Sequence, residues 1–415
     1  MTANPPRLRL GIALEGAGWH PSAWREPSSR PRELFTPEYW VDLVRRAEDG
    51  GVDFVTIEDS FAVQSSDPFA PDDRIDEVRG RLDAVLIASR VAPVTSRIGL
   101  IPTATVTHTE PFHVATGIAT LDYTSLGRAG WQPKVSARSD EARHFGRREI
   151  AGFTGPGDPR LQAHVDAIFA EAADVVEAVR RLWDSWEDDA EIRDVATDRF
   201  LDADKVHRID FEGEWFSVRG PAITPRPPQG QPVVAALAHA EVPYLFAARS
   251  ADLVFVTPID AEDVPRVLAE VRAAEETVGR EGEPLHVYAD LVVFLDGEGE
   301  TASARVARLD ALGRPVASDT RIFAGSAEQL ADAVGELVAA GYAGVRLRPG
   351  VATDDLPRIA GEVVPELVRR GLLPAGVADD VPGDAAASDA EPAESLRGRL
   401  GLPATVPNRY AAVAV

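Results

Sequence analysis

The sequence predicts an α/β protein whose strands and helices alternate to form a (β/α)8 TIM barrel with insertions. Three observations lead to this fold class. The chain has 415 residues, 45% of them hydrophobic, which is enough for one large core. Short apolar runs recur along it and are apolar on both faces, as in parallel strands that are covered by helices. Helical patterns separate most of these runs, and eight such units are the repeat of this barrel.

The predicted strands are residues 8–14, 52–59, 97–106, 127–132, 232–238, 253–258, 285–296 and 344–349. Because the parallel strands of a barrel run the same way, their C-terminal ends meet at one mouth. We therefore expect the active site among the residues that follow these ends.

Several helix boundaries are marked by turn and capping residues. Thr36 is the predicted N-cap of a helix that starts at Pro37 and stops at Gly50. Ser326 begins a predicted capping box. Pro365 lies in the middle of the last helical pattern, where we expect a kink.

Three connections are longer than ordinary loops and are expected to serve function, for example as lids: residues 15–34, residues 133 to about 231, and the region between the seventh and eighth strands. The acidic segment 187–205 has no spacing of metal ligands and is predicted to be solvated. We expect the barrel to occupy residues 1–373, a flexible Pro/Ala/Asp-rich linker residues 374–395, and a C-terminal docking tail residues 396–415.

Composition excludes several classes of protein. The formal net charge of −24 repels phosphate backbones and anionic membranes, so we expect neither nucleic acid nor a membrane as partner. The absence of cysteine excludes disulfides, thiolate metal sites and a cysteine nucleophile. With no signal-peptide pattern and no apolar run of about 18 residues, we expect a cytoplasmic protein.

The predicted mouth is rich in Trp, Thr and His and poor in charge, which suits a flat, mostly apolar ligand. Glu58 and Asp59 are adjacent on a strand, so one of them faces the pocket; an arginine pair or a helix cap is the alternative. His20 and His108 are candidates for catalytic proton transfer, or else satisfied surface residues. No zinc-binding, phosphate-loop or serine-hydrolase spacing occurs, so no metal is expected. Residues 323–326 form either an anion cradle or an ordinary helix cap.

Longer motifs carry a family resemblance. ATLDYTSLGRAGW (119–131), EARHFG (141–146) and RRLWDSWEDDA (180–190) are the most specific, and LRGRLGLP (396–403) continues the likeness into the tail. With these motifs the chain resembles the luciferase-like flavin-dependent monooxygenases, in the branch of nitrilotriacetate, dibenzothiophene-sulfone and long-chain alkane monooxygenases.

The resemblance implies reduced FMN supplied by a separate flavin reductase, dioxygen, a small organic substrate, and a homodimer or homotetramer. Some relatives use a deazaflavin instead. By position, Asp59 matches the family's acidic residue near the flavin ring, and Thr105 or Thr107 the hydroxyl that reaches the ring. Trp131, in the GW motif, is a further candidate for cofactor binding.

The predicted phosphate end differs from the family pattern. The family's serine after the fifth strand is replaced within Ala238-His239-Ala240, and its helix tyrosine by Phe169. His164, His239 and Lys134 are candidates to bind phosphate in their place. The leading hypothesis is an FMN-dependent monooxygenase. The alternatives are a homologue without flavin that acts as a binding or partner subunit, and a deazaflavin-dependent oxidoreductase.

Overall fold

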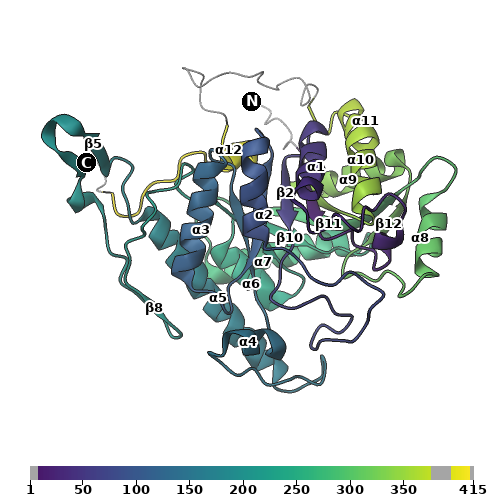
Figure 1. The fold of residues 1–415 in the computed structure, drawn as a ribbon, viewed down its shortest axis with the longest axis horizontal. Helices are drawn as coiled ribbons and strands as arrows, with labels where there is room; N and C mark the ends of the chain where they lie inside the picture. Colours follow the sequence, from purple (N-terminus) through teal and green to yellow (C-terminus); the bar gives the residue numbers. More distant parts are fainter. Residues whose placement is uncertain (1–7, 375–393, 412–415) are drawn as a thin grey trace.

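The computed structural model describes residues 8–374 and 394–411. The predicted linker therefore lies almost wholly outside the described residues, as do the last four residues of the predicted tail. Figure 1 shows a barrel of strands ringed by helices, with an arm that projects from one side.

The barrel closes from eight parallel strands, as predicted. They are β1 (Arg9–Leu14), β2 (Phe54–Ile57), β3 (Gly99–Thr105), β4 (Gly130–Lys134), β9 (Val233–Leu237), β10 (Leu253–Val256), β11 (His286–Leu295) and β13 (Gly344–Pro349). Neighbours pair in this order, and β13 pairs back with β1. The strand ends that we expected to meet therefore share one mouth.

Seven strands lie within their predicted ranges, and β4 is the exception. It begins at Gly130 instead of Gly127. Leu126 and Gly127 form a turn with φ of 56° and 81°, and the Arg128 side chain is used to hold that turn. A conformation with positive φ cannot continue a strand, so the strand starts later and runs on to Lys134.

The helices around the barrel are α1 (Pro37–Asp49), α2 (Ala84–Val91), α3 (Pro111–Thr124), α5 (Leu161–Asp184), α6 (Glu241–Ser250), α7 (Asp263–Val278), α9 (Ala327–Ala340), α10 (Ala352–Arg358) and α11 (Val364–Arg369). The predicted start and stop of α1 are confirmed. A π-helical turn, Ile359–Val363, separates α10 from α11 just before Pro365. Because proline offers no N–H, the α-helical hydrogen bonding is interrupted by this π-helical turn at the position where a kink was predicted.

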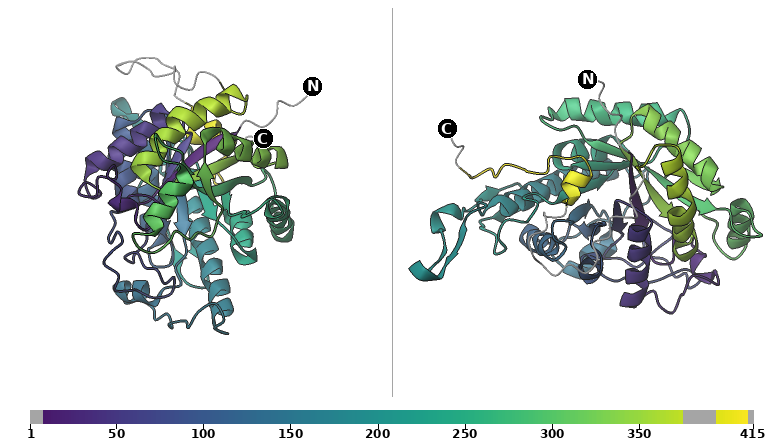
Figure 2. Two further views of the ribbon diagram at one scale, coloured as in Figure 1. Left: turned by 90° about the vertical axis from the view of Figure 1, so that its right-hand side faces the viewer. Right: turned by 90° about the horizontal axis from the view of Figure 1, so that it is seen from above.

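The insertion after β4 forms α4 (Ser139–Phe145) and the projecting arm. The arm carries two antiparallel hairpins, β5 (Glu191–Asp194) with β6 (Arg199–Leu201), and β7 (Phe211–Glu212) with β8 (Ser217–Val218). The left view of Figure 2 places α4 beyond one end of the barrel. Residues 60–83, after β2, form a further long connection, which was not among the three predicted from the sequence.

The insertion after β11 contains α8 (Ala302–Asp310) and a ninth strand, β12 (Ile322–Gly325), which pairs with the second half of β11. Ser326 then caps α9 in the predicted capping box with Gln329. The Ser326 hydroxyl accepts the backbone N–H of Gln329, and the Gln329 side-chain oxygen accepts the backbone N–H of Ser326. Residues 323–326 are therefore an ordinary strand and helix cap rather than an open anion cradle.

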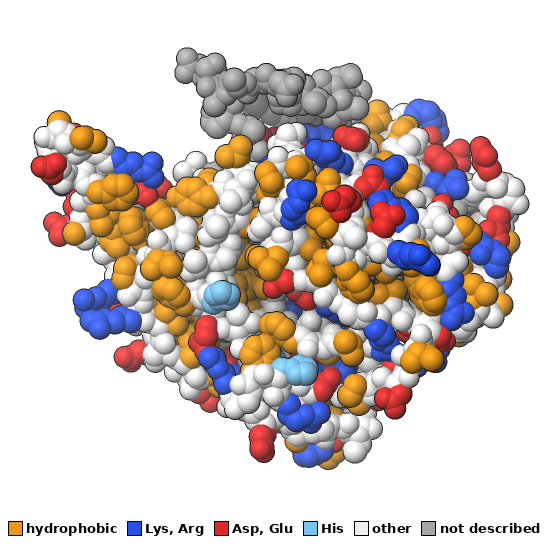
Figure 3. Space-filling model, in the orientation of Figure 1, with side chains coloured by type: hydrophobic (Ala, Val, Ile, Leu, Met, Phe, Trp, Pro, Cys, Tyr) orange, Lys and Arg blue, Asp and Glu red, His pale blue; other side chains and the backbone are white. Residues whose placement is uncertain are grey.

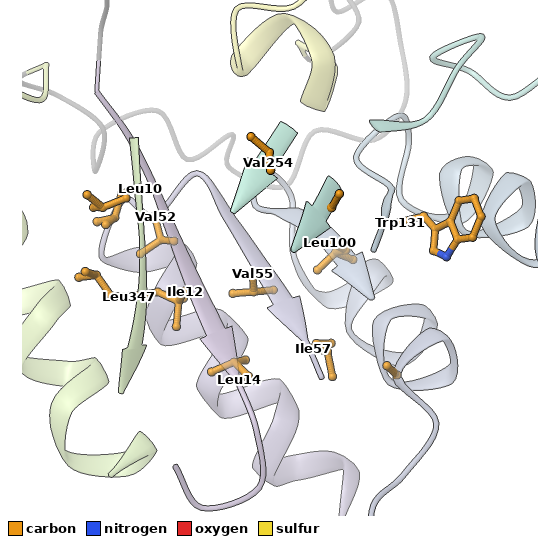
Figure 4. Packing of buried hydrophobic residues seen from close by; sticks show 14 of the residues in the cluster. Leu10, Ile12, Leu14, Val52, Val55, Ile57, Leu100, Trp131, Val254 and Leu347 are labelled. Atoms are coloured by element: carbon orange, nitrogen blue, oxygen red, sulfur yellow. The ribbon is translucent and has the colours of Figure 1, made fainter. Parts of the chain in front are cut away.

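Side chains of the strands alternate between an outer layer under the helices and the barrel interior. Figure 4 shows part of the outer layer, with Ile12, Val55 and Leu100 on three neighbouring strands. The interior is apolar at the N-terminal end of the barrel, where Phe54 and Phe255 stack at 6.0 Å. It becomes charged toward the mouth.

A short helix of the tail, α12 (Leu396–Arg399), closes the N-terminal end of the barrel. Leu396 packs against the interior cluster, and a side chain at Gly99 would overlap it. The Arg397 N–H donates to Gln229 at 3.0 Å. The chain then runs toward the arm (Figure 2, right). There the Asn408 amide donates to the backbone carbonyls of Asp184 and Trp186. Residues 394–411 thus fold onto their own barrel.

Acidic and basic side chains are interspersed on the face in Figure 3 rather than gathered into patches of one sign. None of the helices in the described part of the chain combines the length and the apolar character that a membrane span needs.

Candidate active site

Near the mouth the barrel interior holds a network of buried charges. Arg346 and Arg348 lie two residues apart on β13, so both face the interior. Asp290 of β11 accepts hydrogen bonds from Nε and Nη2 of Arg346 at 2.8 and 2.5 Å, and from Nε of Arg348 at 2.9 Å. All three side chains are at most 3% exposed. Such buried charges persist only as a paired set.

The network extends across the strand ends to β2, β3 and β4. Nη1 of Arg346 donates to Oε1 of Gln132 at 2.9 Å and lies 3.4 Å from Oε1 of Glu58. Nε2 of Gln132 donates to the Thr103 hydroxyl at 3.1 Å. Glu58 is therefore the member of the adjacent carboxylate pair that faces the pocket.

The prediction of a mouth poor in charge is wrong. The prediction failed because Arg346 and Asp290 each lie within an otherwise apolar strand and are 56 residues apart in the sequence. The sequence did contain a signal that was missed. Arginines alternate in GVRLRP, and an aspartate interrupts LHVYADLVVFLD; a charge inside a buried strand needs a partner within the barrel.

A cavity of about 300 Å³ lies at the mouth, lined by the loop after β1 and by residues of other connections. Trp19 forms part of its wall, and the Arg348 guanidinium lies 4.7 Å from the centre of the indole ring. The indole thus covers the charged network by a cation–π contact. Glu77 and Arg314, also in the wall, pair through hydrogen bonds of 2.9 and 3.0 Å.

His20 lines the same cavity, but both its ring nitrogens are engaged. Nε2 lies 3.1 Å from the Asp310 carboxylate, and Nδ1 accepts the Ser22 N–H at 2.9 Å. Burial lowers the pKa of His20, while Asp310 acts in the opposite direction. The ring therefore joins the loop after β1 to the end of α8.

Asp59 turns away from the interior. Its carboxylate accepts the backbone N–H groups of Ser60 at 2.7 Å and of Ala84 at 3.0 Å, so it fixes the start of α2. Burial raises the pKa of Asp59, and these hydrogen bonds oppose that rise. Lys134 donates to the Asp59 carbonyl at 2.7 Å and thereby ties the end of β4 to the end of β2.

The end of β3 and its loop carry three of the predicted site residues. Thr105 is buried as the last residue of β3, and the Thr107 hydroxyl accepts the Ser136 N–H at 2.8 Å. The His108 ring stacks on Phe145, with ring centres 5.2 Å apart and planes at 17°. His108 and Thr107 also line a second cavity of about 230 Å³.

His108, unlike His20, has an open nitrogen. The residue is 6% exposed, yet its Nε2 has no hydrogen-bond partner. Burial lowers the pKa of His108, and the charge of Glu141 opposes that shift. A mainly neutral imidazole with an open nitrogen can take up and release a proton near pH 7.

Two further polar atoms near this loop are buried without a partner: Oε2 of Glu141 and Nε2 of His164. Both histidines feel the charges of the same ion pair, Arg148 with Glu171, which places them in one neighbourhood. Unpaired buried polar atoms cost stability, so a group of them indicates a ligand site. Other unpartnered atoms are scattered over the described residues; the Tyr288 hydroxyl, for example, lies in the apolar interior near the closed end.

Trp131 does not reach the mouth. The residue is fully buried in the outer layer, where its ring meets Trp183 edge-on with centres 6.4 Å apart. Figure 4 shows the indole on the outer side of the strands, toward the helices. Its neighbour Gln132 is the residue of this strand that points inward, because adjacent side chains alternate.

The family model of the luciferase-like monooxygenases matches residues 17–336 of the chain. The chain belongs to the luciferase-like monooxygenase family. It is 33% identical to N-acetyl-S-(2-succino)cysteine monooxygenase of Bacillus subtilis, over 75% of this chain and 66% of that protein. It is also 33% identical to nitrilotriacetate monooxygenase component A of Aminobacter aminovorans, over 90% and 79% of the two chains.

Among solved structures, EDTA monooxygenase from Chelativorans sp. BNC1 superposes with a TM-score of 0.75 at 21% identity, over 96% of this chain and 99% of that one. This likeness concerns the fold. The chain spans about two thirds of the length of the Bacillus relative and more of the Aminobacter one.

The end of this luciferase-like barrel that the sequence assigns to flavin phosphate offers few hydroxyls. Ala240 precedes α6 and caps it without a side-chain hydrogen bond, and His239 is exposed. Phe169 packs edge-on against Phe246 with ring centres 5.6 Å apart. The positive end of the α6 dipole and His239 are the groups here that attract a phosphate.

The residues at the mouth fit a polar ring system better than they fit a phosphate. The open nitrogens of His108 and His164 and the open oxygen of Glu141 offer both donors and acceptors beside the ends of β2–β4. Flavins combine an apolar ring with polar edges, which such a donor set can hold.

Proposed function

We propose that this chain is the oxygenase component of a two-component monooxygenase that uses reduced FMN, dioxygen and a small organic substrate. A separate flavin reductase would supply the reduced FMN. The observation that carries the proposal is the group of unpartnered buried polar atoms on His108, Glu141 and His164 at the mouth of a luciferase-like barrel. The named relatives, monooxygenases of small organic acids, support this substrate class.

Bound reduced FMN would supply the electrons that activate dioxygen. In this proposal Thr105 and Thr107 hold the ring edge, and Asp59 fixes the start of α2 beside it. His239 serves the phosphate end, and His164 lies with His108 beside the ring. Lys134 is already engaged with the Asp59 carbonyl.

His108 is the proposed proton-transfer residue, because its Nε2 is open whereas both nitrogens of His20 are engaged. His20 is then a residue that holds the loops over the cavity. The long connections after β1 and β2 line that cavity and would exclude water from it.

Flavin binding is the direct test. The purified protein is titrated with oxidised FMN and, without oxygen, with reduced FMN, and binding is measured by fluorescence and calorimetry. We expect saturable binding with preference for the reduced form. Absence of binding at high-micromolar FMN would favour the alternative of a homologue without flavin, which the altered phosphate end motivates.

Restoring the missing hydroxyls tests the assignment of the phosphate end. Ala240→Ser and Phe169→Tyr should each tighten FMN binding by roughly tenfold, because a charge-assisted hydrogen bond contributes about 1.5–3 kcal/mol. Ala304→Ser, on the exposed face of α8, is the matched control and should leave affinity unchanged. Equal affinities in all three variants would place the phosphate elsewhere.

A further inference from the structure

Glu141 is a buried carboxylate without an assigned role. It is the third residue of α4 and is 1% exposed. Its Oε1 accepts the Ser60 hydroxyl at 2.5 Å, while Oε2 has no hydrogen-bond partner. None of the salt bridges within the described residues involves Glu141, and the nearby Arg138 is paired with Asp140. A carboxylate buried in this way is costly, and natural proteins keep such groups mainly at functional sites.

Helix α4 holds this carboxylate beside His108. Glu141 and Phe145 are four residues apart and so lie on one face of the helix. Phe145 stacks on the His108 ring and also meets Phe61 with ring centres 4.7 Å apart. The same face is thus anchored to the loop after β3 through Phe145 and to the loop after β2 through Ser60.

The other charges around His108 largely cancel. Arg148 and Glu171 both act on it, but they pair with each other through two hydrogen bonds, so their effects oppose at short range. His144, on α4, opposes a charge on His108 only when it is itself protonated. The charge of Glu141 also acts on Arg138, but that guanidinium is paired with Asp140 through two hydrogen bonds. Glu141 therefore has no salt-bridge partner of its own in the described residues, and its negative charge is the one that remains.

We propose that Glu141 is a positioning residue that acts through His108: its fixed carboxylate favours the protonated imidazole and lets His108 hold a proton for a ligand in the adjoining cavity. The identity of that ligand rests on the proposed function. The link between the carboxylate and the imidazole belongs to the protein alone and exists without flavin.

The test is an NMR titration of the histidine imidazoles in flavin-free protein, with the His108 signal assigned from a His108→Gln sample. In Glu141→Gln, which keeps the shape and removes the charge, His108 should bind its proton about threefold or more weakly than in wild type. Glu149→Gln is the matched control, since Glu149 is exposed and its charge is not among those that act on His108. An unchanged His108 titration in Glu141→Gln overturns the proposal.

Two variants guard against misfolding of Glu141→Gln. Glu141→Asp keeps the charge and should restore most of the wild-type proton affinity. Ser60→Ala frees one anchor of the carboxylate and should weaken proton binding less than Glu141→Gln does. If His108 in Glu141→Asp binds its proton as weakly as in Glu141→Gln, the charge is not the cause and the proposal fails. An FMN titration of the same samples separates this failure from that of the proposed function, because either result is possible without the other.

Discussion

The turn at residues 122–130 and the pocket around His108 belong to neighbouring parts of one β/α unit, yet they use buried polar groups in opposite ways. In the turn, Asp122 accepts three hydrogen bonds, from the Ala129 N–H and from the backbone and side chain of Gln229. In the pocket, His108 and Glu141 are similarly buried, but each leaves one polar atom without a partner.

The guanidinium of Arg128 extends the contrast. It donates five hydrogen bonds, four of them to backbone carbonyls that precede β3 and β4. These contacts lie at the N-terminal end of the barrel, where side chains serve stability, and the pocket lies at the C-terminal end, where they serve chemistry. The ATLD and GR motifs that carry the family likeness therefore stabilise the fold.

Removal of Arg128 should have the largest effect on stability. Arg128→Ala leaves several buried carbonyls unpaired, and we expect the free energy of unfolding to fall by about 3–5 kcal/mol. Arg147→Ala, at the mouth, removes an arginine that is 59% exposed and should cost below about 1 kcal/mol. Urea denaturation measures both. Similar losses of unfolding free energy in the two variants would contradict the view that the N-terminal end of the barrel serves stability and the mouth does not.

The tail contact should come next. Leu396 is fully buried in the closed end of the barrel, so Leu396→Ala should lower the free energy of unfolding by about 2–4 kcal/mol. Leu86→Ala on α2, where the leucine is 68% exposed, is the control and should change little. A Leu396→Ala protein as stable as wild type would show that α12 is not needed to close the barrel.

Asp122 gives the turn a pH dependence. Burial raises the pKa of Asp122 from 3.8 to about 6. The folded state therefore binds this proton more tightly than the unfolded state, and the stabilising contribution is complete below about pH 4 and lost as pH rises through 6. The stability of wild type relative to Asp122→Asn should fall by about 2–3 kcal/mol between pH 4 and 7. Thermal unfolding across that range measures the difference, and a constant difference contradicts the assignment.

The pocket should show the smallest effect on stability and the largest on function. His108→Leu removes an unpartnered nitrogen, so the free energy of unfolding should stay level or rise by up to about 1 kcal/mol. Turnover with reduced FMN should fall at least a hundredfold if His108 transfers the proton. A destabilised variant with normal turnover would assign His108 to the scaffold.

Features that depend on neighbouring residues were predicted from the sequence, and features that depend on distant contacts were not. Seven strands were predicted because each is a local apolar run, and β4 was displaced because the positive φ of Leu126 depends on contacts of Arg128 far along the chain. His108 was found because it follows a strand end. Glu141 and Arg346 were not, since their roles depend on partners 81 and 56 residues away.

The sequence by itself determined the barrel, its family and most of its boundaries, because hydrophobic period, capping residues and turns act over short distances. The tertiary structure alone decided which polar residues are open. Glu58 and Asp59 are adjacent, as are Trp131 and Gln132. Yet Glu58 and Gln132 face the interior network, while Asp59 accepts the Ala84 N–H at the start of α2 and Trp131 packs outside. Only the closure of the barrel brings β13, β11 and β4 together. In the closed barrel the charges of Arg346 and Asp290 pair with each other, whereas His108 and Glu141 each keep a polar atom without a hydrogen-bond partner.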